Sequence, residues 1–461
     1  MMTNRFEEKR VLIIGAARQG LALARYLVKA GARVTLTDRQ SADQLRSSRN
    51  QLSDLPVEWV LGEHPVSLLE DRDLICVSGG VPLTLPILRE ASRRGIPLTN
   101  DSQIFMELVK APVVAITGSA GKTTTTSLFG LVASHELTSP RKAWVGGNIG
   151  NPLIEVVDQI QPEDLVIQEL SSFQLELMTT SPHVAAVLNI TPNHLDRHAS
   201  MAEYIAAKAR ILDFQHSGDI AILNRDDPEA WNLKDRIHGN LVSFGFRQCD
   251  TDEAQVFVAE KQIIGRTGSN TSTLLDTSTI HLRGNHNLMN VLAVCALSYA
   301  LNFSAKSLTT AVNSFTGVKH RLQIVREHQG ITWVNDSIAT APERTLAAIR
   351  SFHEPLVLLL GGRDKNLPWD ELSAVIHHRV DHVIVFGESA AKILSALGDI
   401  QPGDRLQSIS HHASLTDALE ASLQVARPGS VVLLSPGCTS YDAFKDFEER
   451  GEKFIEWVNA L

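Results

Sequence analysis

Short apolar runs alternate with longer amphipathic segments through the first hundred residues. The runs at 11–14, 34–37 and 74–77 predict buried strands, because parallel strands covered on both faces read as continuous apolar stretches. Segments 21–30 and 86–94 carry apolar residues at helical spacing. This alternation of strand and helix predicts a small doubly wound α/β unit.

The same alternation returns twice further along the chain. Apolar runs that predict strands lie at 113–117, 165–169, 184–190 and 220–224, and again at 331–335, 356–360, 382–386 and 431–434. A helical pattern covers 288–300. Between them, short alternating segments at 241–246, 255–258 and 279–282 predict a small antiparallel insert.

We therefore expect an α/β chain of three domains. Residues 1–105 would form a Rossmann-like N-terminal domain, residues 106–318 a central P-loop-type domain with the antiparallel insert, and residues 319–461 a C-terminal Rossmann-like domain. The length of 461 residues agrees with this number, since a domain averages roughly 150 residues.

Composition excludes several classes of protein. Hydrophobic residues make up 43% and charged residues 21%, which is typical of a globular chain. The net charge of −9 and the lack of a basic run argue against a nucleic-acid partner. Four widely spaced cysteines (Cys76, Cys249, Cys295, Cys438) fit a reducing compartment. Without a signal-like segment or an apolar stretch of ~18 residues, we expect a cytoplasmic protein with no membrane partner.

A glycine-rich loop follows the strand at 113–117. It reads Gly118, Ser119, Ala120, Gly121, Lys122, Thr123, Thr124. Such loops let backbone N–H groups close on phosphate oxygens, while the lysine reaches the outer phosphates and the hydroxyl suits Mg²⁺. An ordinary strand–turn–helix corner is the alternative, which the strand before the loop and the helix after it disfavour. The loop predicts ATP, without indicating the reaction.

A second glycine turn lies near the N-terminus. Gly15 and Gly20 imitate a dinucleotide fingerprint in which Ala17 replaces the middle glycine, and Asp38 ends the next strand, where an acid would meet a ribose or base. A redox cofactor, another nucleotide and a purely structural turn all remain open from this pattern.

One lysine falls on an apolar helix face. Ser200 and Glu203 form a capping-box signal for a helix start. On that helix Lys208 shares a stripe with Met201, Ile205, Ile211 and Leu212. Desolvation would lower its pKa, which is the condition for reaction with CO₂. A lysine that buries only its stem and keeps its charge in water is the alternative, and the periodicity leaves both open.

Motifs along the whole chain resemble those of the Mur ligases, which build the stem peptide of peptidoglycan. They lie at residues 118–124, 145–150, 169–175, 189–196, 284–287, 320–321, 335–337, 435–440 and 444–447. The last two are most similar to those of the member that adds D-glutamate. The resemblance implies an ATP-dependent ligase that activates a carboxylate as an acyl phosphate and joins it to an amino acid.

The resemblance also implies roles for individual residues. Catalysis would fall to Lys122, His194, Lys208 and Lys365. ATP would be bound by Gly118, Ser119, Ala120, Gly121, Lys122, Thr123, Thr124, Asn287, Asn290, Arg321 and Asp336. Two Mg²⁺ ions would be held by Thr123, Glu169, His194 and Lys208, the last as a carbamate. Zinc at His194, Asp196 and His198 is the alternative, but triphosphate chemistry favours the hard cation.

The implied substrates are UDP-N-acetylmuramoyl-L-alanine and glutamate, and we expect a monomer. The sugar nucleotide would be bound by Gly15, Gln19, Gly20, Asp38, Gly80 and Asn148. Glutamate would be bound by Thr340, Lys365, Ser440 and the backbone at Phe447. Three departures stand out: Gln19 replaces a hydroxyl-bearing residue, Ala120 an asparagine, and Ile338 a lysine. Because some relatives that add L-glutamate also lack that lysine, the enantiomer stays open.

Other classes compete with this interpretation. A nucleotide-dependent oxidoreductase would rest on the turn from Gly15 to Gly20, and predicts no role for Lys122. A P-loop ATPase that couples hydrolysis to a partner leaves Thr340, Lys365 and Ser440 without a role. Another Mur or folylpolyglutamate-type ligase is the alternative within the family. Domain closure is expected, because neither nucleotide loop alone encloses the reacting groups.

Overall fold

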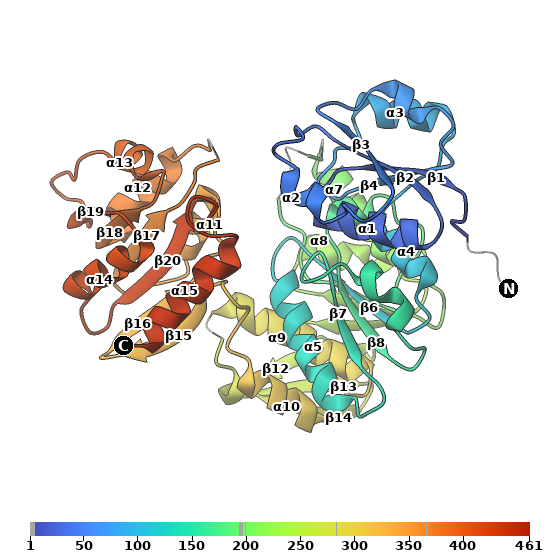
Figure 1. Cartoon of the computed structure of the whole chain (residues 1–461). Coiled ribbons are helices and arrows are strands. Elements are labelled where there is room, and N and C mark those ends of the chain that lie inside the picture. Colours follow the sequence, from blue (N-terminus) through green and yellow to red (C-terminus); the bar gives the residue numbers. More distant parts are fainter. Residues whose placement is uncertain (1–4, 193–196, 199, 283, 366) are drawn as a thin grey trace. The chain divides into compact units, whose positions relative to one another are not determined.

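The computed structural model describes residues 5–192, 197–198, 200–282, 284–365 and 367–461 (Figure 1). Within these ranges the strands form three sheets, and the backbone groups into two compact units, Met1–Phe315 and Thr316–Leu461. The first two sheets belong to the first unit. No described helix combines the length and apolarity that crossing a membrane requires. The expected domain boundaries after residues 105 and 318 stay predictions.

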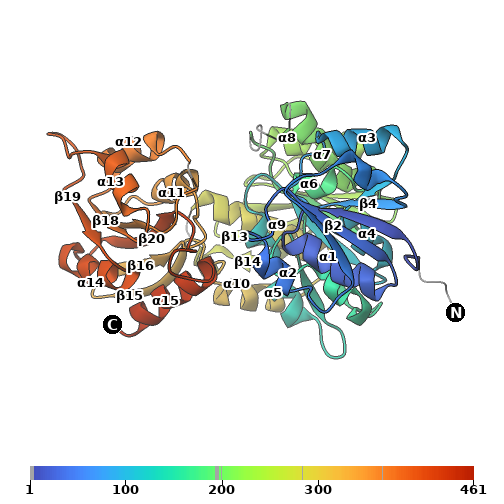
Figure 2. The same cartoon turned by 45° about the horizontal axis from the view of Figure 1, so that its top comes forward.

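The N-terminal sheet is parallel, in the order β3-β2-β1-β4-β5. Its strands are β1 Arg10–Ile14, β2 Arg33–Asp38, β3 Val57–Leu61, β4 Leu74–Val77 and β5 Leu98–Thr99. The helices are α1 Arg18–Lys29, α2 Arg46–Asn50, α3 Pro86–Arg93 and α4 Asp101–Leu108, with the 3₁₀ turn η1 Val66–Leu69. Val11 and Ile13 pack with α1 and α4, whereas Leu12 and Ile14 pack with α3, so both faces are covered (Figure 2).

The central sheet runs β14-β13-β12-β11-β10-β9-β6-β8-β7. Its strands are β6 Val113–Thr117, β7 Ala143–Gly147, β8 Leu165–Glu169, β9 Val184–Val187, β10 Ile220–Asn224, β11 Asn240–Phe244, β12 Ala254–Ala259, β13 Gln262–Thr267 and β14 Asn270–Asp276. The helices are α5 Lys122–Glu136, α6 Ser172–Leu175, α7 Met201–Asp213, α8 Pro228–Trp231, α9 Asn285–Ala300 and α10 Ala305–Ser314, with 3₁₀ turns η2 Leu153–Gln159, η3 Asn232–Arg236 and η4 Thr277–Thr279. The phosphate loop lies between β6 and α5.

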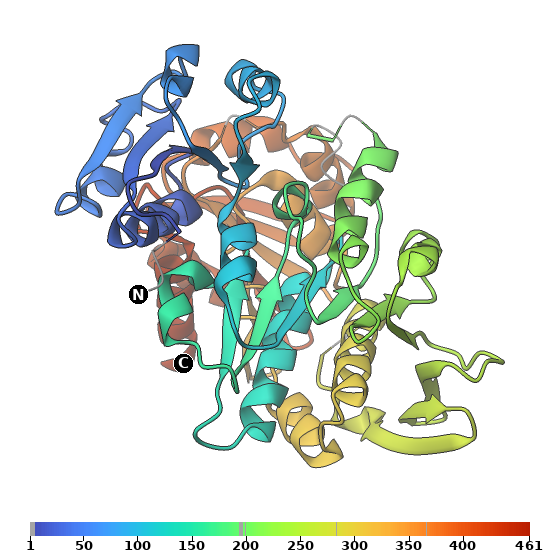
Figure 3. The same cartoon turned by 90° about the vertical axis from the view of Figure 1, so that its right-hand side faces the viewer.

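The predicted antiparallel part exists, but its bounds differ from the expectation. Strand β11 is parallel to β10, and β12 is parallel to β11, so the central sheet continues without a break. Only the pairings β12–β13 and β13–β14 are antiparallel (Figure 3, yellow-green). Residues 279–282 are not a strand, because the chain turns at η4 and enters α9. The alternating pattern indicated strands without indicating their partners.

The C-terminal sheet runs β15-β16-β20-β17-β18-β19. Its strands are β15 Gln323–His328, β16 Ile331–Asn335, β17 Leu356–Gly361, β18 His382–Phe386, β19 Ser408–His412 and β20 Val431–Gly437. The helices are α11 Pro342–Ile349, α12 Asp370–Arg379, α13 Ala390–Leu397, α14 Leu415–Val425 and α15 Phe447–Asn459. All pairings are parallel except β15–β16. The sheet is buried on both faces, since Leu358 and Leu359 belong to separate cores.

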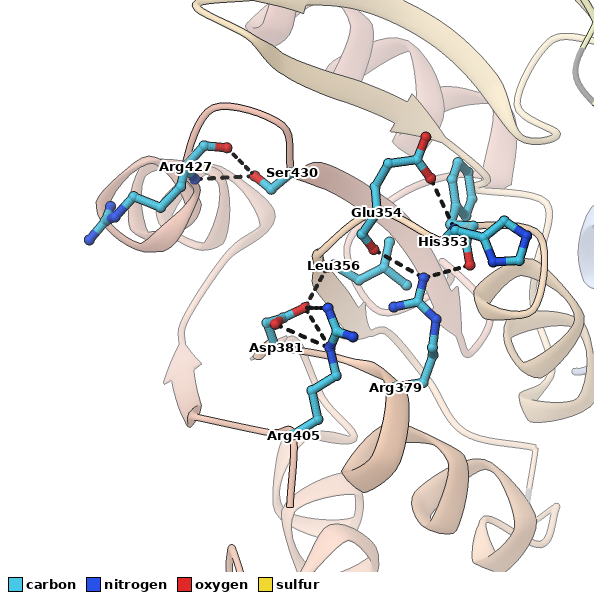
Figure 4. A network of polar contacts seen from close by, with 9 residues as sticks. His353, Glu354, Leu356, Arg379, Asp381, Arg405, Arg427 and Ser430 are labelled. Carbon is cyan, nitrogen blue, oxygen red and sulfur yellow. Dashed lines mark hydrogen bonds and ion pairs between the residues drawn. The ribbon is translucent and has the colours of Figure 1, made fainter. Parts of the chain in front are cut away.

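A network of polar contacts stabilises the amino ends of strands in the C-terminal sheet (Figure 4). The Asp381 carboxylate accepts from the Leu356 amide at 2.8 Å and from Nη2 of Arg405 at 3.2 Å. Arg379 donates to the carbonyl oxygens of Phe352 and Glu354. These bonds satisfy backbone groups at the edge opposite the candidate site, so they stabilise the sheet without touching that site.

Candidate functional site

The phosphate loop leaves β6 at the carboxyl edge of the central sheet. Gly121 has a φ of 81°, and a Cβ there would lie 2.2 Å from Oδ1 of Asn290. Glycine therefore allows the close approach of Asn290, a predicted ATP residue on α9. Lys122 bends over the loop, with Nζ 2.8 Å from the Gly118 carbonyl oxygen. Thr123 lies with Thr124 in the first turn of α5, so the loop has the geometry of a phosphate cradle.

Asn189 supports this loop from the segment that follows β9, the strand next to β6. Its Oδ1 accepts from the Ala120 amide at 2.8 Å, and its Nδ2 donates to the Ala120 carbonyl at 3.0 Å. The Ser119 hydroxyl lies 2.9 Å from the Tyr204 hydroxyl. Asn189 was not among the predicted site residues, although it opens the motif at 189–196. Asn189 fixes the backbone of Ala120, so the loop keeps its shape although position 120 carries no asparagine.

Lys208 is buried against the same loop. The residue is only 1% exposed, and its Nζ donates to the Gly118 carbonyl at 2.9 Å. The alternative of a charge kept in water is therefore wrong. Burial lowers the pKa of Lys208 well below its ordinary value, the charge of Lys122 lowers it further, and Glu169 opposes both. Of the two interpretations that the sequence pattern left open, the buried lysine is the one the structure confirms, and the fold places it beside the phosphate loop.

Glu169 ends β8, directly beside β6. Its Oε1 accepts from Nδ2 of Asn148 at 2.8 Å, while Oε2 is buried and has no hydrogen-bond partner among the described residues. A buried carboxylate oxygen without a donor suits a cation. No group of three or more metal-ligating side chains occurs in the described ranges. His194 and Asp196, which the metal predictions include, lie outside those ranges.

The ring of His198 is held in place by contacts within the protein. One ring nitrogen lies 3.0 Å from the Ser172 hydroxyl and the other 3.2 Å from the Glu176 carboxylate. The ring stacks on Phe173 at a centroid distance of 5.3 Å. Both nitrogens are therefore occupied, which speaks against His198 as a zinc ligand.

The N-terminal glycine turn brings the predicted nucleotide residues together. Gly15 has a φ of 103°, and a Cβ on Gly20 would lie 2.0 Å from the Gly15 carbonyl oxygen, so both positions require glycine. Asp38 accepts from the Ala16 amide at 2.8 Å and thereby shapes the turn. A Cβ on Gly79 would lie 3.3 Å from Oε1 of Gln19, which places the loop that carries Gly80 beside the turn.

The predicted glutamate residues lie in the second unit, on loops that follow neighbouring strands. Nζ of Lys365 donates to the Thr340 hydroxyl at 3.2 Å. Burial lowers the pKa of Lys365, and the charge of Arg344 lowers it further. The Phe447 carbonyl accepts from the Ser337 hydroxyl at 2.8 Å. Ser440 is buried near the start of the loop after β20.

Asp336, a predicted ATP-binding residue, is buried in this unit. Arg321, another predicted ATP-binding residue, lies close enough for its charge to act on Asp336. The Asp336 carboxylate accepts from the Ser435 hydroxyl at 2.8 Å and from the Leu322 amide at 3.1 Å. Burial raises its pKa to about 7. Asn287 and Asn290 belong to α9 of the first unit, so the predicted ATP residues come from both units.

Sequence reasoning missed Arg450, which is fully buried under the glutamate loops. Its guanidinium donates to the carbonyl oxygens of Ser337 at 2.9 Å, Cys438 at 3.1 Å and Gly361 at 3.3 Å. Burial lowers its pKa to about 10. A signal did exist, because Arg450 shares one face of α15 with the buried Phe454 and Val458 at a spacing of four residues.

These features define a class of protein. A glycine–lysine–threonine loop at the carboxyl edge of a parallel sheet, beside a buried lysine and a half-satisfied buried carboxylate, is the geometry of an enzyme that binds a nucleoside triphosphate. A second nucleotide-type turn, and a separate unit in which Lys365 contacts Thr340, indicate further substrates.

Family models cover most of the chain. The match is to the Mur ligase MurD-like N-terminal domain over residues 9–100, to the Mur ligase middle domain over 116–298, and to the Mur ligase glutamate ligase domain over 320–438. The chain belongs to the Mur ligase family. It is therefore an ATP-dependent ligase with the three-domain α/β fold of that family, and the oxidoreductase and hydrolysis-coupled alternatives are wrong.

Relatives and solved structures agree with this assignment. The chain is 40% identical over 454 residues to UDP-N-acetylmuramoylalanine--D-glutamate ligase of Symbiobacterium thermophilum, covering 98% of each chain. It is 40% identical over 461 residues to the enzyme of the same name from Pelotomaculum thermopropionicum, covering 100% of this chain and 99% of the relative. The fold is similar to that of UDP-N-acetylmuramate-alanine ligase MurC from Thermotoga maritima, with a TM-score of 0.54, 18% identity, and coverage of 98% of this chain and 99% of the other. The fold is also similar to that of MurF from Acinetobacter baumannii, with a TM-score of 0.56 and 17% identity. This match covers 98% of this chain and 94% of the other.

Proposed function

We propose that this protein adds D-glutamate to UDP-N-acetylmuramoyl-L-alanine in the cytoplasm, acting as a monomer. The observation that carries the proposal is full-length similarity to enzymes of that name. The second unit supports it, because Lys365 and Thr340 are joined there by a hydrogen bond. Neither nucleic acid nor membrane takes part in the proposed reaction.

The phosphate loop would position ATP for transfer to the carboxylate of the sugar nucleotide. A free carboxylate is a poor electrophile, so phosphorylation must come first; the amine of glutamate then attacks the acyl phosphate, and inorganic phosphate leaves. Lys122 and the loop amides would hold the triphosphate, and positioning with charge neutralisation would supply most of the rate. Asn290, in contact with the loop at Gly121, would orient the nucleotide.

The reaction would use two Mg²⁺ ions, bound by side chains at this loop and by His194. Their chemistry would be to screen the repulsion between the triphosphate and the attacking carboxylate. Glu169 would offer its free Oε2, Thr123 its hydroxyl and His194 its ring. Lys208 would act as a carbamate: its neutral amine attacks CO₂ and loses a proton, and the carbamate nitrogen keeps one hydrogen for the bond to Gly118.

The glutamate pocket would recognise two carboxylates by cationic and polar groups. Lys365 and Thr340 would bind one, and Ser440 with the Phe447 backbone the other. Ile338 cannot supply the charge that a lysine gives in relatives. Arg344 donates to the Ile338 carbonyl at 3.3 Å, so its guanidinium would supply positive charge beside Ile338.

Phosphate release from ATP, measured with UDP-N-acetylmuramoyl-L-alanine and a panel of amino acids, tests the proposal. We expect release with D-glutamate, and none without the sugar nucleotide. Release with L-glutamate alone would reassign the enantiomer. Release only with a folate or with another stem-peptide precursor would replace the proposed substrate by an alternative within the family.

A further inference from the structure

Arg18 joins the N-terminal glycine turn to the central domain. It is the first residue of α1, and its Nη2 donates to the Asn148 carbonyl at 3.1 Å. This is the one hydrogen bond that its guanidinium makes within the described ranges, although an arginine side chain carries five N–H donors. The side chain is exposed, so its remaining donors face solvent beside the turn from Gly15 to Gly20.

The other basic residues on the same face of α1 are neutralised. Arg25 and Lys29 follow Arg18 at intervals of seven and four residues, which places all three along one side of the helix. Arg25 pairs with Glu155, and Lys29 with Asp158 at 3.0 Å, both acids on η2. Arg18 meets a carbonyl oxygen instead of a carboxylate, so its charge lacks a paired acid at the end of the helix that adjoins the nucleotide turn.

Two carboxylates lie in this neighbourhood, and neither forms an ion pair with Arg18. Asp38 accepts from the amides of Ala16 and Gln40. Asp101 is buried in the first turn of α4; burial raises its pKa to about 6, and the charge of Arg18 lowers it only in part. The guanidinium therefore remains available to an anion from outside the protein.

Asn148 fixes the guanidinium rather than competing for an anion. Its amide nitrogen donates to the Glu169 carbonyl at 2.9 Å, and its side-chain Nδ2 donates to Oε1 of Glu169. With both donors engaged by Glu169, the carbonyl of Asn148 holds Arg18 between the glycine turn and the central sheet. An arginine fork held in this way matches the geometry of phosphate oxygens.

We propose that Arg18 binds the diphosphate of the sugar nucleotide directly, as an additional substrate-binding residue; this rests on the proposed function. The neighbouring Gln19 has a neutral amide, which supplies no charge. Arg18 then contributes the positive charge that the turn itself lacks. The interaction is with the diphosphate only, so uridine binding should not depend on it.

Isothermal titration of UDP and of uridine against Arg18→Ala, Arg18→Lys and Arg25→Ala tests the inference. Arg25→Ala is the matched control, because Arg25 also joins α1 to the central domain. We expect Arg18→Ala to weaken UDP binding on the order of tenfold to a hundredfold, with uridine unchanged. Arg18→Lys should retain part of the affinity for UDP, and Arg25→Ala all of it. In turnover, Arg18→Ala should raise KM for the sugar nucleotide and leave kcat nearly unchanged.

Three outcomes would overturn the inference. They are equal UDP affinity in Arg18→Ala and the wild type, a parallel loss of UDP and uridine binding, and the same loss in Arg25→Ala. The last two would assign Arg18 a merely structural role. Failure of the wild-type protein to bind UDP would instead contradict the proposed function, so the two failures are distinguishable.

Discussion

Nζ of Lys208 lies 2.9 Å from the carbonyl oxygen of Gly118, so a lysine on α7 contacts the phosphate loop directly. The same carbonyl accepts from Lys122 at 2.8 Å. Burial and mutual repulsion disfavour a positive charge on both lysines at once, because they share one acceptor. A carbamate on Lys208 would remove one of them and add a negative group facing Mg²⁺.

Lys208→Ala should therefore abolish ligation while leaving the phosphate loop intact. We expect high concentrations of a small carboxylate, such as acetate, to restore part of the activity by entering the vacated space. ¹³C NMR after addition of labelled bicarbonate should show a carbamate signal in the wild type and lose it in the variant. Lys122→Ala is the control, since acetate cannot replace a cation. A variant that acetate and bicarbonate leave inactive, together with no carbamate signal, would refute carbamylation.

Asn148→Ala should weaken metal binding at Glu169. Asn148 orients the carboxylate through Oε1, and loss of such an outer partner typically costs roughly 10–100-fold in metal affinity. Titration with Mn²⁺, followed by electron paramagnetic resonance without nucleotide, measures this directly. Glu169→Gln should lower the affinity at least as much, and Glu163→Gln, an exposed change, should leave it unaltered. Equal Mn²⁺ affinity in all three variants would remove Glu169 from the metal site.

Arg450→Leu should destabilise the second unit. The change leaves buried carbonyl oxygens at Ser337, Cys438 and Gly361 without a donor. An unsatisfied buried acceptor costs about 1–3 kcal/mol, so we expect the free energy of unfolding to fall by at least about 3 kcal/mol. Urea unfolding, monitored within this unit, gives the value. Arg350→Leu removes only a surface ion pair and should change it by less than about 1 kcal/mol; equal effects would contradict the structural role of Arg450.

Stability of the second unit should fall as the pH rises through neutrality. Nδ1 of His377 lies 2.6 Å from the Asp404 carboxylate and Nε2 lies 2.8 Å from the Leu397 carbonyl, so both nitrogens face acceptors. Burial opposes the charged ring, but the hydrogen bonds to Asp404 and Leu397 outweigh burial and raise its pKa. A raised pKa in the folded state gives stability that is complete below the unfolded value of about 6.5 and is lost above the folded pKa.

His377→Gln tests this pH dependence. The variant should be less stable than the wild type at pH 6, and the difference in thermal midpoint should shrink by pH 8. His378→Gln, on the exposed side of α12, is the control and should follow the wild type. A constant difference across this range would show that His377 is not charged in the folded protein.

Features encoded by neighbouring residues were predictable from the sequence. The loop from Gly118 to Lys122 is continuous in the chain, and the face of Lys208 follows from helical periodicity alone. The edge strands β3 and β15 were missed because they are only partly buried and lack a continuous apolar run. The contacts of Asn189 with Ala120 and of Arg18 with Asn148 join residues far apart in the chain, and no local pattern indicates such partners.

Transfer of oxygen from substrate to phosphate tests the central claim most directly. The sugar nucleotide would carry ¹⁸O in both oxygens of its alanyl carboxylate, and the inorganic phosphate formed with ATP and D-glutamate would be analysed by mass spectrometry. Activation as an acyl phosphate predicts that one labelled oxygen leaves with each phosphate and the other stays in the new amide. Phosphate without label, released at the rate of amide formation, would contradict the account.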